Sequence, residues 1–429
     1  MTNTTPTAPA GPPAGASHAE KLPSLWGNRD FLFLWSGRTV SHVGSAASGV
    51  VFPLLILSIT GDNALLAGIA VALGTLPYVL LSLHAGALVD RWDRKRVLIW
   101  SMALRAANIA SVVVTLSAGS ITLWQLYLNA LIEGTLVVFT GIAATAALPR
   151  VVPKLQLPDA NSQSLAADTL AQMSGPALGT WLYQAVSRAA PFLLEVVSYL
   201  MSAVLMLFIR RSLQGERVPT QSSLRQEIAR GWIWWWTQPF LRSMAYINSG
   251  LHLVLPALTL LIIVRAKDVG VPDGSVGLLF TAGALGGLAG ALVGPRLQRR
   301  LSYGRAVPGI ILYQALTFPL LAVAPAPVVL GLAFFLVEAA PPAYDVVQYS
   351  YRLALIPDEL QGRVNSSFRL LAWGTRPVGA LLAGFLLEWV GGMVTALLYA
   401  ALLLSLSLAA FANRHIRNAP PLAEVARQS

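Results

Sequence analysis

Three carboxylates lie inside long apolar segments of the sequence, where a charged side chain is costly. Glu133 and Glu338 lie near the middle of two such segments, and Asp345 follows Glu338 at i+7, so both can face one cavity. A carboxylate that loses its water binds a proton more readily, and ionisable groups within a membrane are functional candidates. We therefore expect Glu133 to be the first candidate for a proton carrier and Asp345 the second. The alternative for each residue is a structural ion pair between helices.

Basic side chains lie in the same kind of segment and could be partners of these carboxylates. Arg376 is near the middle of an apolar segment, where it could bind an anionic substrate or stabilise the ionised form of the carboxylates. Arg38 precedes His42 by one helical turn, which places both side chains on one face of a helix. If Glu133 is a structural residue, Arg38 or Arg376 could be its partner. Glu195, in another apolar segment, is interpreted as structural.

The residues that would support other chemistry are missing from the sequence. There is no cysteine, so a thiol nucleophile and a cysteine-based metal site are excluded, and no other metal centre is expected. The sequence contains no Ser-His-Asp arrangement, phosphate loop or nucleotide-binding motif. We therefore expect neither enzyme activity nor a cofactor, and we expect an energy source other than ATP.

The composition is that of a membrane protein. Of the 429 residues, 55% are hydrophobic and only 11% are charged, whereas a soluble globular protein has about 25% charged residues. At about 20 residues per transmembrane helix, the chain has room for about twelve helices and for no large soluble domain. We therefore expect an all-α membrane protein. The expected helices lie near residues 31–59, 64–88, 97–118, 123–148, 164–187, 190–209, 241–265, 275–296, 305–323, 326–352, 366–388 and 393–413.

The chain is expected to have five parts, with both termini in the cytoplasm. The first residues are rich in Pro, Ala, Gly, Ser and Thr, which indicates disorder, and they lack the basic end and apolar core of a signal peptide. Charged residues alternate with Ile and Trp at 224–236, which is typical of an amphipathic helix in the membrane interface. The parts are a cytoplasmic tail at 1–28, a six-helix bundle at 29–211, a cytoplasmic linker with the amphipathic helix at 212–239, a second six-helix bundle at 240–414 and a tail at 415–429.

The positive charge of the chain follows its expected membrane topology. The formal net charge is +11. Three basic residues lie in the expected outer turns and three within the expected helices: Arg188, Arg265 and Lys267, and Arg38, Arg105 and Arg376. All other Lys and Arg residues lie on the expected cytoplasmic side, as the positive-inside rule requires. The charge therefore reflects topology, and nucleic-acid binding is not implied.

A short charged loop joins two of the apolar segments and must lie at a water interface. Its sequence, GALVDRWDRKR at residues 86–96, resembles the G-x-L-(A/V)-D-R-x-x-R-(K/R) signature between spans 2 and 3 of major facilitator superfamily transporters. Gly86 would let two helices approach closely, and Asp90 could accept hydrogen bonds from a helix N-terminus. Asp93 replaces the usual second glycine. The alternative is an orientation signal with solvated ion pairs. The gating loop that the resemblance implies comprises Gly86, Asp90, Arg91, Arg94 and Lys95.

The two halves of the chain repeat at an offset of about 204 residues. Glu133 and Glu338 are equivalent under this repeat, and Gly294 stands where the first half has Asp90. Other matching pairs are Pro53 with Pro256, Gly86 with Gly290, Asn161 with Asn365, and Pro176 with Pro377. Two parallel six-helix repeats are the arrangement of the major facilitator fold. We therefore expect twelve transmembrane helices in two pseudo-symmetric bundles that rock about a site near the bilayer midplane.

The fifth apolar segment contains a second motif. Residues 174–180, SGPALGT, resemble the G-P-x-x-G-G element in span 5 of proton-coupled exporters of this superfamily, with Thr180 in place of the last glycine. Pro176 can kink the helix because it removes a backbone donor, and Gly175 and Gly179 form a small-xxx-small contact face. The structural interpretation is a kinked packing helix. The resemblance implies that this face sets the alternating-access equilibrium and favours export.

The resemblance covers the chain from about residue 28 to 415. The segments LPRVVP at 148–153 and PDELQGRVN at 357–365 are similar to the branch that contains the enterobactin exporter and macrolide and multidrug efflux proteins. This resemblance implies a secondary active transporter of the bacterial inner membrane. It would export an amphipathic small molecule, such as a drug, antibiotic, siderophore or other natural product, by proton antiport with alternating access.

Two alternatives to this function stay open. One is a lipid or lysophospholipid flippase on the same fold, and the other is a membrane sensor or scaffold that has lost transport. The intact Asp90 loop, the glycines of the fifth segment and the buried carboxylates argue against a scaffold. The expected partners are a small-molecule substrate, protons and the lipid bilayer, with no nucleic acid, and the protein is expected to be a monomer.

Overall fold

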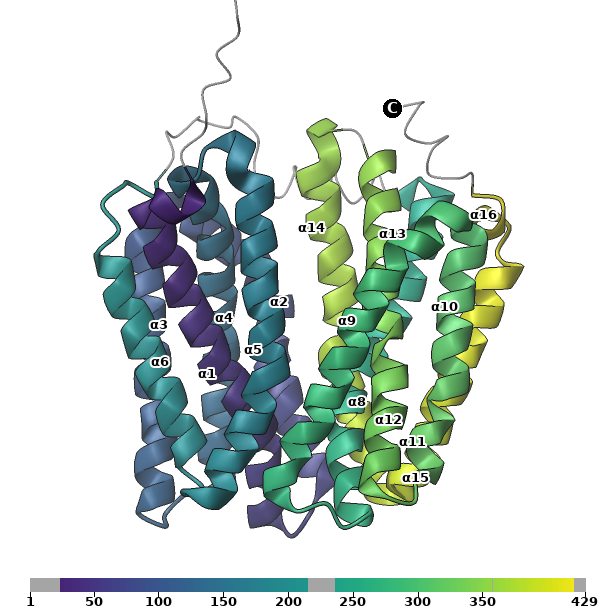
Figure 1. The fold of residues 1–429 in the computed structure, drawn as a ribbon, viewed down its shortest axis with the longest axis horizontal. Coiled ribbons are helices and arrows are strands. Elements are labelled where there is room, and N and C mark those ends of the chain that lie inside the picture. The colour runs from purple at the N-terminus through teal and green to yellow at the C-terminus, as the bar shows by residue number, and fades with distance from the viewer. Residues whose placement is uncertain (1–23, 215–235, 357, 420–429) are drawn as a thin grey trace, which may run out of the picture.

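The first half of the chain forms a bundle of six long helices, which we call the N-terminal bundle (Figure 1). This computed structural model describes residues 24–214, 236–356 and 358–419. Side chains just before α2, α3 and α4 accept hydrogen bonds from backbone N–H groups of the first turn and so fix where these helices begin. The helices are η1 (Leu25–Gly27), α1 (Arg29–Thr60), α2 (Ala64–Arg91), α3 (Arg94–Ser117), α4 (Leu123–Val151), η2 (Lys154–Gln156), α5 (Leu157–Ala185) and α6 (Ala190–Leu207).

The second half forms the C-terminal bundle, whose helices are more often interrupted. Gly391 has φ 74° and ψ 172°, so α15 turns back on itself at this residue. Proline begins α11 and α12 and follows the first residue of α13, where it cannot donate to the preceding turn. The helices are α8 (Pro239–Asp268), η3 (Asp273–Ser275), α9 (Val276–Arg300), α10 (Tyr303–Thr317), α11 (Pro319–Val323), α12 (Pro327–Glu338), α13 (Ala340–Leu355), α14 (Asp358–Gly374), α15 (Arg376–Ala412) and α16 (Arg414–Arg417).

The all-α membrane fold expected from the sequence is confirmed. Ten helical segments of the described residues are long and apolar enough to cross a membrane. That number treats residues 367–412 as one segment although the chain reverses at Gly391, and it omits α5, which has 29 residues but many polar side chains. The expected amphipathic helix at 224–236 and most of both tails lie outside the described residues.

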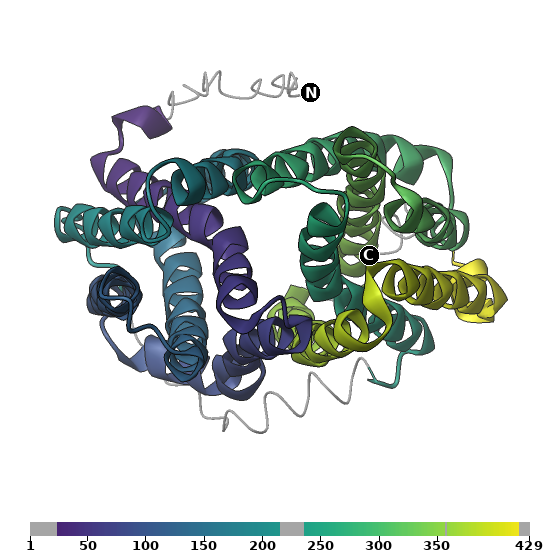
Figure 2. The ribbon, with the colours of Figure 1, turned by 90° about the horizontal axis from the view of Figure 1, so that it is seen from below.

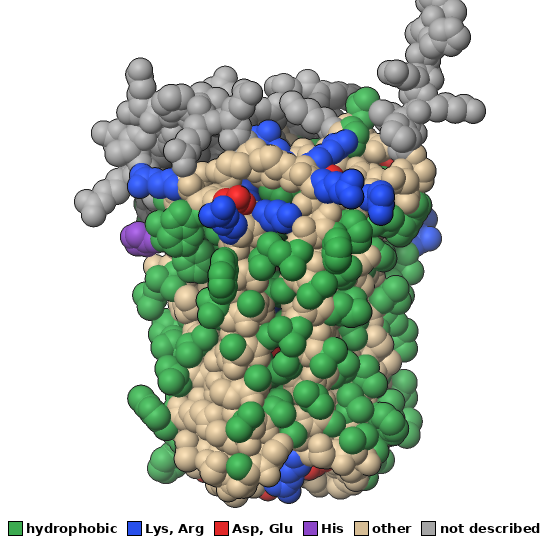
Figure 3. Space-filling view, turned by 90° about the vertical axis from the view of Figure 1, so that its left-hand side faces the viewer, with side chains coloured by type: hydrophobic (Ala, Val, Ile, Leu, Met, Phe, Trp, Pro, Cys, Tyr) green, Lys and Arg blue, Asp and Glu red, His purple; other side chains and the backbone are tan. Residues whose placement is uncertain are grey.

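The surface shows where lipid would contact the protein. Apolar side chains cover the flank of the N-terminal bundle between two ends at which Lys and Arg side chains lie (Figure 3). Large apolar side chains of α3, α4 and α6, such as Trp100, Leu128 and Val197, are about half exposed or more. A soluble protein rarely exposes a continuous apolar surface of this size. The protein is therefore a multi-pass membrane protein with an apolar belt around its helices.

The two bundles lie side by side and contact each other mainly at one end, which we call the closed end (Figures 1 and 2). This end carries the turn between α1 and α2 and the helix η3, whereas the start of α1 and α16 lie at the other, terminal end. At the closed end Glu388 accepts the backbone N–H of Ala64 at 2.7 Å, and Lys267 pairs with Asp62. Gly68 and Gly384 let α2 and α15 approach backbone to backbone.

Candidate functional site

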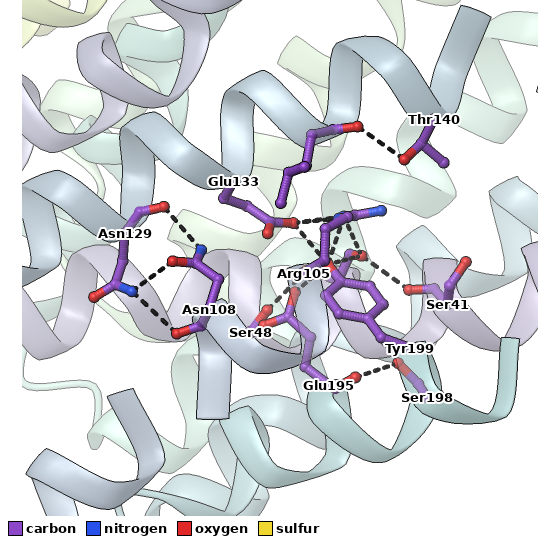
Figure 4. Close-up of polar contacts among 12 residues, drawn as sticks. Ser41, Ser48, Arg105, Asn108, Asn129, Glu133, Thr140, Glu195, Ser198 and Tyr199 are labelled. Atoms are coloured by element: carbon purple, nitrogen blue, oxygen red, sulfur yellow. Dashed lines mark hydrogen bonds and ion pairs between the residues drawn. The ribbon is translucent and has the colours of Figure 1, made fainter. Parts of the chain in front are cut away.

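Arg105 on α3 forms a buried ion pair in the N-terminal bundle (Figure 4). Only 7% of the residue is exposed. Its guanidinium approaches Oε1 of Glu133 on α4 through Nε, at 2.7 Å, and through Nη2, at 2.6 Å. The partner of Glu133 is therefore Arg105, and the expectation that Arg38 or Arg376 would pair with it is wrong for this structure.

Tyr199 on α6 connects two carboxylates through one hydroxyl group. Its Oη lies 2.9 Å from Glu133 Oε1 and 2.6 Å from Oε1 of Glu195, which is one turn away on the same helix and 4% exposed. Nη2 of Arg105 donates to the same hydroxyl at 2.5 Å, and Ser45 Oγ of α1 lies 2.9 Å from it. We call these five residues the Arg105 cluster. They join α1, α3, α4 and α6.

The number of protons in the Arg105 cluster determines what it can do. A tyrosine hydroxyl has one proton, so Tyr199 can donate to only one of the two carboxylates at a time. The short contact with the other carboxylate then requires a proton on that carboxyl group. Two ionised carboxylates facing one guanidinium would also leave a buried negative charge without compensation. The geometry therefore accommodates one further proton on Glu133 or Glu195, next to the hydroxyl of Tyr199.

Of the five residues in this cluster, sequence reasoning named only Glu133 as a site residue. Arg105 was noted only as a cation within an expected helix, Glu195 was interpreted as structural, and Ser45 and Tyr199 were given no role. The i, i+4 spacing of Glu195 and Tyr199 places both on one face of α6, and Arg105 is one of few cations within the apolar segments. These were usable signals. The sequence interpretation of Glu195 as structural does not include its contact with Tyr199, which closes the connection to Glu133.

Arg38 and His42 share a carboxylate of α5 that sequence reasoning did not single out. Arg38 Nη2 lies 2.7 Å from Asp168 Oδ2, in a charged hydrogen bond. His42 Nδ1 lies 3.1 Å from Asp168 Oδ1, in an electrostatic contact without hydrogen-bond alignment. The two basic residues do lie on one face of α1, as expected, and this face is turned toward α5. The three side chains tie α1 to α5 and are partly exposed.

A cavity of about 370 Å³ lies in the C-terminal bundle among α8, α10, α13, α14 and the first residue of α15. Ligand cavities have volumes of roughly 300–1,000 Å³, so a small molecule could fit. Trp373 in its wall lies 4.6 Å from the ring of Tyr78 on α2, which places the cavity beside the N-terminal bundle. Its wall contains aromatic residues and amides together with the ionisable side chains His252, Asp345, Arg352, Arg369 and Arg376.

Two of the expected site residues line this cavity and one does not. Asp345 is exposed within it, and no basic side chain of the described residues lies within 4.0 Å of its carboxylate. Arg376 is half-buried in the wall. Glu338 ends α12, outside the lining, and its side chain has no hydrogen bond among the described residues. The cavity that Glu338 and Asp345 were expected to share is not formed here, because Pro341 interrupts the helix between them.

The charged loop between α2 and α3 is shorter than expected, because α2 continues to Arg91 and α3 begins at Arg94. Asp90 Oδ1 lies 3.1 Å from Arg94 Nη2, and the Asp90 side chain is 72% exposed. The carboxylate that accepts hydrogen bonds from a helix N-terminus is Asp93, which caps α3. That role was expected of Asp90, and the structure gives it to the residue that departs from the family signature.

The basic residues of this loop fasten helix ends. Lys95 Nζ donates to the carbonyl oxygens of Leu207 at 2.9 Å and Ile209 at 2.7 Å, where cations are favoured because a helix ends there. Arg94 Nη1 donates to Ala146 O at 3.2 Å. Among the described residues, no atom outside the local backbone of α2 lies within 4 Å of the position that a Cβ of Gly86 would occupy, so the expected close approach of another helix is absent there.

The glycines of α5 contact α1 closely. A methyl group at Gly175 would lie 2.9 Å from the carbonyl carbon of Ala46, and one at Gly179 would lie 2.6 Å from that of Ala47. Pro176 lies between them inside the helix. Thr180, which replaces the last glycine of the motif, is fully buried and bonds across the two bundles. Its Oγ1 accepts the N–H of Gly277 at 3.1 Å and lies 3.1 Å from Gly274 O.

Comparisons with known proteins agree with this architecture. The transmembrane secretion effector family matches residues 25–428. The multidrug efflux pump Tap of Mycolicibacterium fortuitum is 26% identical over 373 residues, which are 84% of this chain and 89% of that protein. Macrolide efflux protein A of Streptococcus pyogenes is 26% identical over 188 residues, 44% of this chain and 46% of that protein.

A solved structure shows the same fold. It is a bacterial homologue of the iron transporter ferroportin in an inward-facing state, with a TM-score of 0.69 and 20% identity over 90% of this chain and 99% of that one. The family and these neighbours are transporters and not enzymes. The family match covers nearly the whole chain, and the fold that carries the buried Arg105 cluster is that of a major facilitator transporter. The chain therefore belongs to the transmembrane secretion effector family of the major facilitator superfamily, whose members are efflux and secretion transporters.

Proposed function

We propose that the protein exports an amphipathic small molecule, such as a drug, antibiotic, siderophore or other natural product, across the bacterial inner membrane in exchange for protons. The observation that carries this proposal is the Arg105 cluster, in which Glu133 and Glu195 are connected by the hydroxyl of Tyr199. Relatives named for multidrug and macrolide efflux support the direction of transport and the class of substrate.

The cluster would couple protons to helix packing. Its members come from four helices of one bundle, so gain or loss of its proton changes the charge balance between those helices. With the proton bound, the negative charges facing Arg105 fall from two to one. Release of the proton restores repulsion between Glu133 and Glu195, which a packed bundle relieves only by a discrete rearrangement. The contact of Gly175 and Gly179 with α1 and the loop around Asp90 lie in the same bundle and would respond to it.

Alternating access would use the contacts at the closed end. We assign the terminal end to the cytoplasm because Lys and Arg side chains gather there (Figure 3). The bundles meet at the opposite end through Glu388, Lys267 and Thr180, so the conformation described is inward-facing. Substrate would enter from the cytoplasm, and proton binding from outside would follow once these contacts had opened.

Transport in everted membrane vesicles tests this proposal. Vesicles energised with lactate should accumulate the substrate only if they contain the protein, and a protonophore should abolish accumulation. A candidate substrate can be chosen by growth protection against a panel of antibiotics and siderophores in a strain without its own efflux pumps. Accumulation that survives a collapsed proton gradient would contradict proton antiport.

A further inference from the structure

Three polar atoms in the wall of the C-terminal cavity are buried and have no hydrogen-bond partner among the described residues. They are Tyr344 Oη, Arg352 Nε and Arg376 Nε. A guanidinium nitrogen can only donate a hydrogen bond, and a phenol can donate one. A buried donor without an acceptor is costly, and it becomes favourable when a ligand supplies the acceptor. A ligand that carries hydrogen-bond acceptors would therefore satisfy these three donors.

The charges of the cavity wall also favour a ligand with hydrogen-bond acceptors, and in particular an anion. Arg352, Arg369 and Arg376 line the cavity, and Asp345 is the only carboxylate among its described lining residues. No carboxylate of the described side chains lies within 4.0 Å of Arg352 or Arg376. In the N-terminal bundle, by contrast, Arg105 has a carboxylate 2.6 Å away. The cavity wall has an excess of positive charge, and an arginine in such a wall is suited to bind carboxylates, sulfonates or phosphates.

The rest of the wall is aromatic and apolar. The guanidinium of Arg376 lies 4.0 Å from the ring centroid of Trp373, and that of Arg352 lies 4.4 Å from the ring centroid of Phe368. These rings hold the two cations in place without neutralising their charge. Trp373 is partly exposed and provides an apolar surface next to Arg376, whereas Phe368 is fully buried against Arg352.

We infer that this cavity binds an amphipathic anion, with its anionic group at Arg352 and Arg376 and its apolar or aromatic part against Trp373. This inference rests on the proposed function, because it names the class of substrate that would be exported. The competing ligand is a lipophilic cation held by Asp345 and the aromatic rings. The excess of positive charge and the unsatisfied donors favour the anion.

A matched pair of fluorescent probes tests the inference without a proton gradient. 8-Anilinonaphthalene-1-sulfonate and N-phenyl-1-naphthylamine share one aromatic skeleton, and only the first carries a sulfonate. Binding of each probe is measured on the full-length protein in lipid nanodiscs, with signal from empty nanodiscs subtracted. We expect the sulfonate to bind at least about 10-fold more tightly than the neutral amine, since charged hydrogen bonds are worth a factor of this order.

Variants of the cavity wall then test where the sulfonate group of the bound probe lies. Arg376→Gln and Arg352→Gln should each weaken its binding about 10-fold or more and leave binding of the neutral amine unchanged. Asp345→Asn should strengthen sulfonate binding, because it removes a like charge from the wall. Arg305→Gln is the matched control, since Arg305 is an exposed arginine of the same bundle outside the cavity.

Two outcomes would overturn the inference. One is a sulfonate that binds no better than the neutral amine, and the other is sulfonate binding that neither arginine variant weakens. A third probe, a quaternary ammonium analogue whose binding is lost in Asp345→Asn, would indicate the cation instead. Because no gradient is present, these results are independent of proton coupling: export that resists a protonophore would remove the antiport proposal and leave the anion site standing.

Discussion

The two bundles share a fold and differ in how their buried charges are satisfied. In the N-terminal bundle Arg105 is paired with Glu133 and connected to Glu195 through Tyr199. In the C-terminal bundle Arg376 and Arg352 lie on aromatic rings with unsatisfied nitrogens beside a cavity. Arg105 has a carboxylate 2.6 Å away, although Glu133 Oε2 has no hydrogen-bond partner among the described residues. Arg352 and Arg376 have no carboxylate of the described side chains within 4.0 Å. Charges that are paired within the protein can respond to a proton, whereas unpaired charges can bind a ligand. The comparison suggests that one bundle handles protons and the other the substrate.

The largest difference between the two bundles is expected in the loss of stability when a buried arginine is replaced by methionine. Arg105→Met would leave the buried Glu195 and the partly buried Glu133 without their cation, and breaking a buried pair from one side costs about 3–5 kcal/mol. Arg376→Met removes a cation that has no carboxylate partner among the described side chains, so stability should stay the same or rise. Thermal unfolding of both variants in one detergent measures the difference. Equal losses of Tm would mean that Arg376 is as much a part of the packing as Arg105.

The equivalent glutamates of the two repeats should differ in transport. Glu133→Gln keeps the shape of the side chain but not its charge, so gradient-driven export should stop while exchange of labelled for unlabelled substrate persists. Glu338→Gln should export at nearly the wild-type rate, because Glu338 has no polar contact among the described residues. Both variants are to be assayed beside their Tm values. If Glu133→Gln loses stability together with all transport, Glu133 is structural, and if it exports normally, the proton pathway lies elsewhere.

Glycine substitutions should show where the bundles are alike. A methyl group at Gly179 would lie 2.6 Å from the carbonyl carbon of Ala47, and one at Gly379 would lie 2.9 Å from that of Leu253. Overpacking of this kind costs about 1–3 kcal/mol, so both alanine variants should be destabilised to a similar degree. Gly86→Ala is the control, because open space surrounds that position. A large effect at only one of the two sites would mean that the bundles differ in packing as well as in charge.

The smallest difference is expected at the helix caps. Asp93 accepts two backbone N–H groups at the start of α3, whereas Ser302, before α10 in the other bundle, makes no such side-chain bond. Asp93→Ala should therefore cost about 0.5–2 kcal/mol, and Ser302→Ala close to nothing. Urea unfolding midpoints followed by circular dichroism would resolve the two. Asp90→Ala should also have little effect on stability, as expected of an exposed i, i+4 pair.

Sequence reasoning located most of the helices because the cost of a charge in lipid imposes long apolar segments. The reversal at Gly391 lies between the expected helices 366–388 and 393–413 and so was predicted. The breaks between α12 and α13 and between α14 and α15 fall inside the expected helices 326–352 and 366–388, and they were missed because they depend on local backbone geometry within apolar stretches. The site likewise has residues that a single segment of sequence reveals and contacts that it does not reveal. Glu133 was identifiable as a carboxylate in an apolar segment.

Partners across helices could not be predicted in the same way. Arg38 and His42 were visible as neighbours because one helical turn separates them, but Asp168 belongs to another helix. The pairing of Glu133 with Arg105 likewise depends on how α3 packs against α4. The unsatisfied nitrogens of Arg352 and Arg376 follow from the arrangement of several helices around a cavity. Periodicity along one helix contains no information about such contacts.

The hydrogen bond that Thr180 makes between the bundles would affect how fast they separate. A glycine at this position would offer no side chain, whereas the threonine hydroxyl accepts the backbone N–H of Gly277 from the other bundle. A net contribution of about 0.5–1.5 kcal/mol from one such bond corresponds to a dwell time about 2- to 12-fold longer in this conformation, if opening must break it first. The hydroxyl would then help to set how long the protein stays in this conformation. Single-molecule recordings of wild type and Thr180→Val would measure the two dwell times. Thr180→Val should therefore complete more transport cycles per second than the wild type.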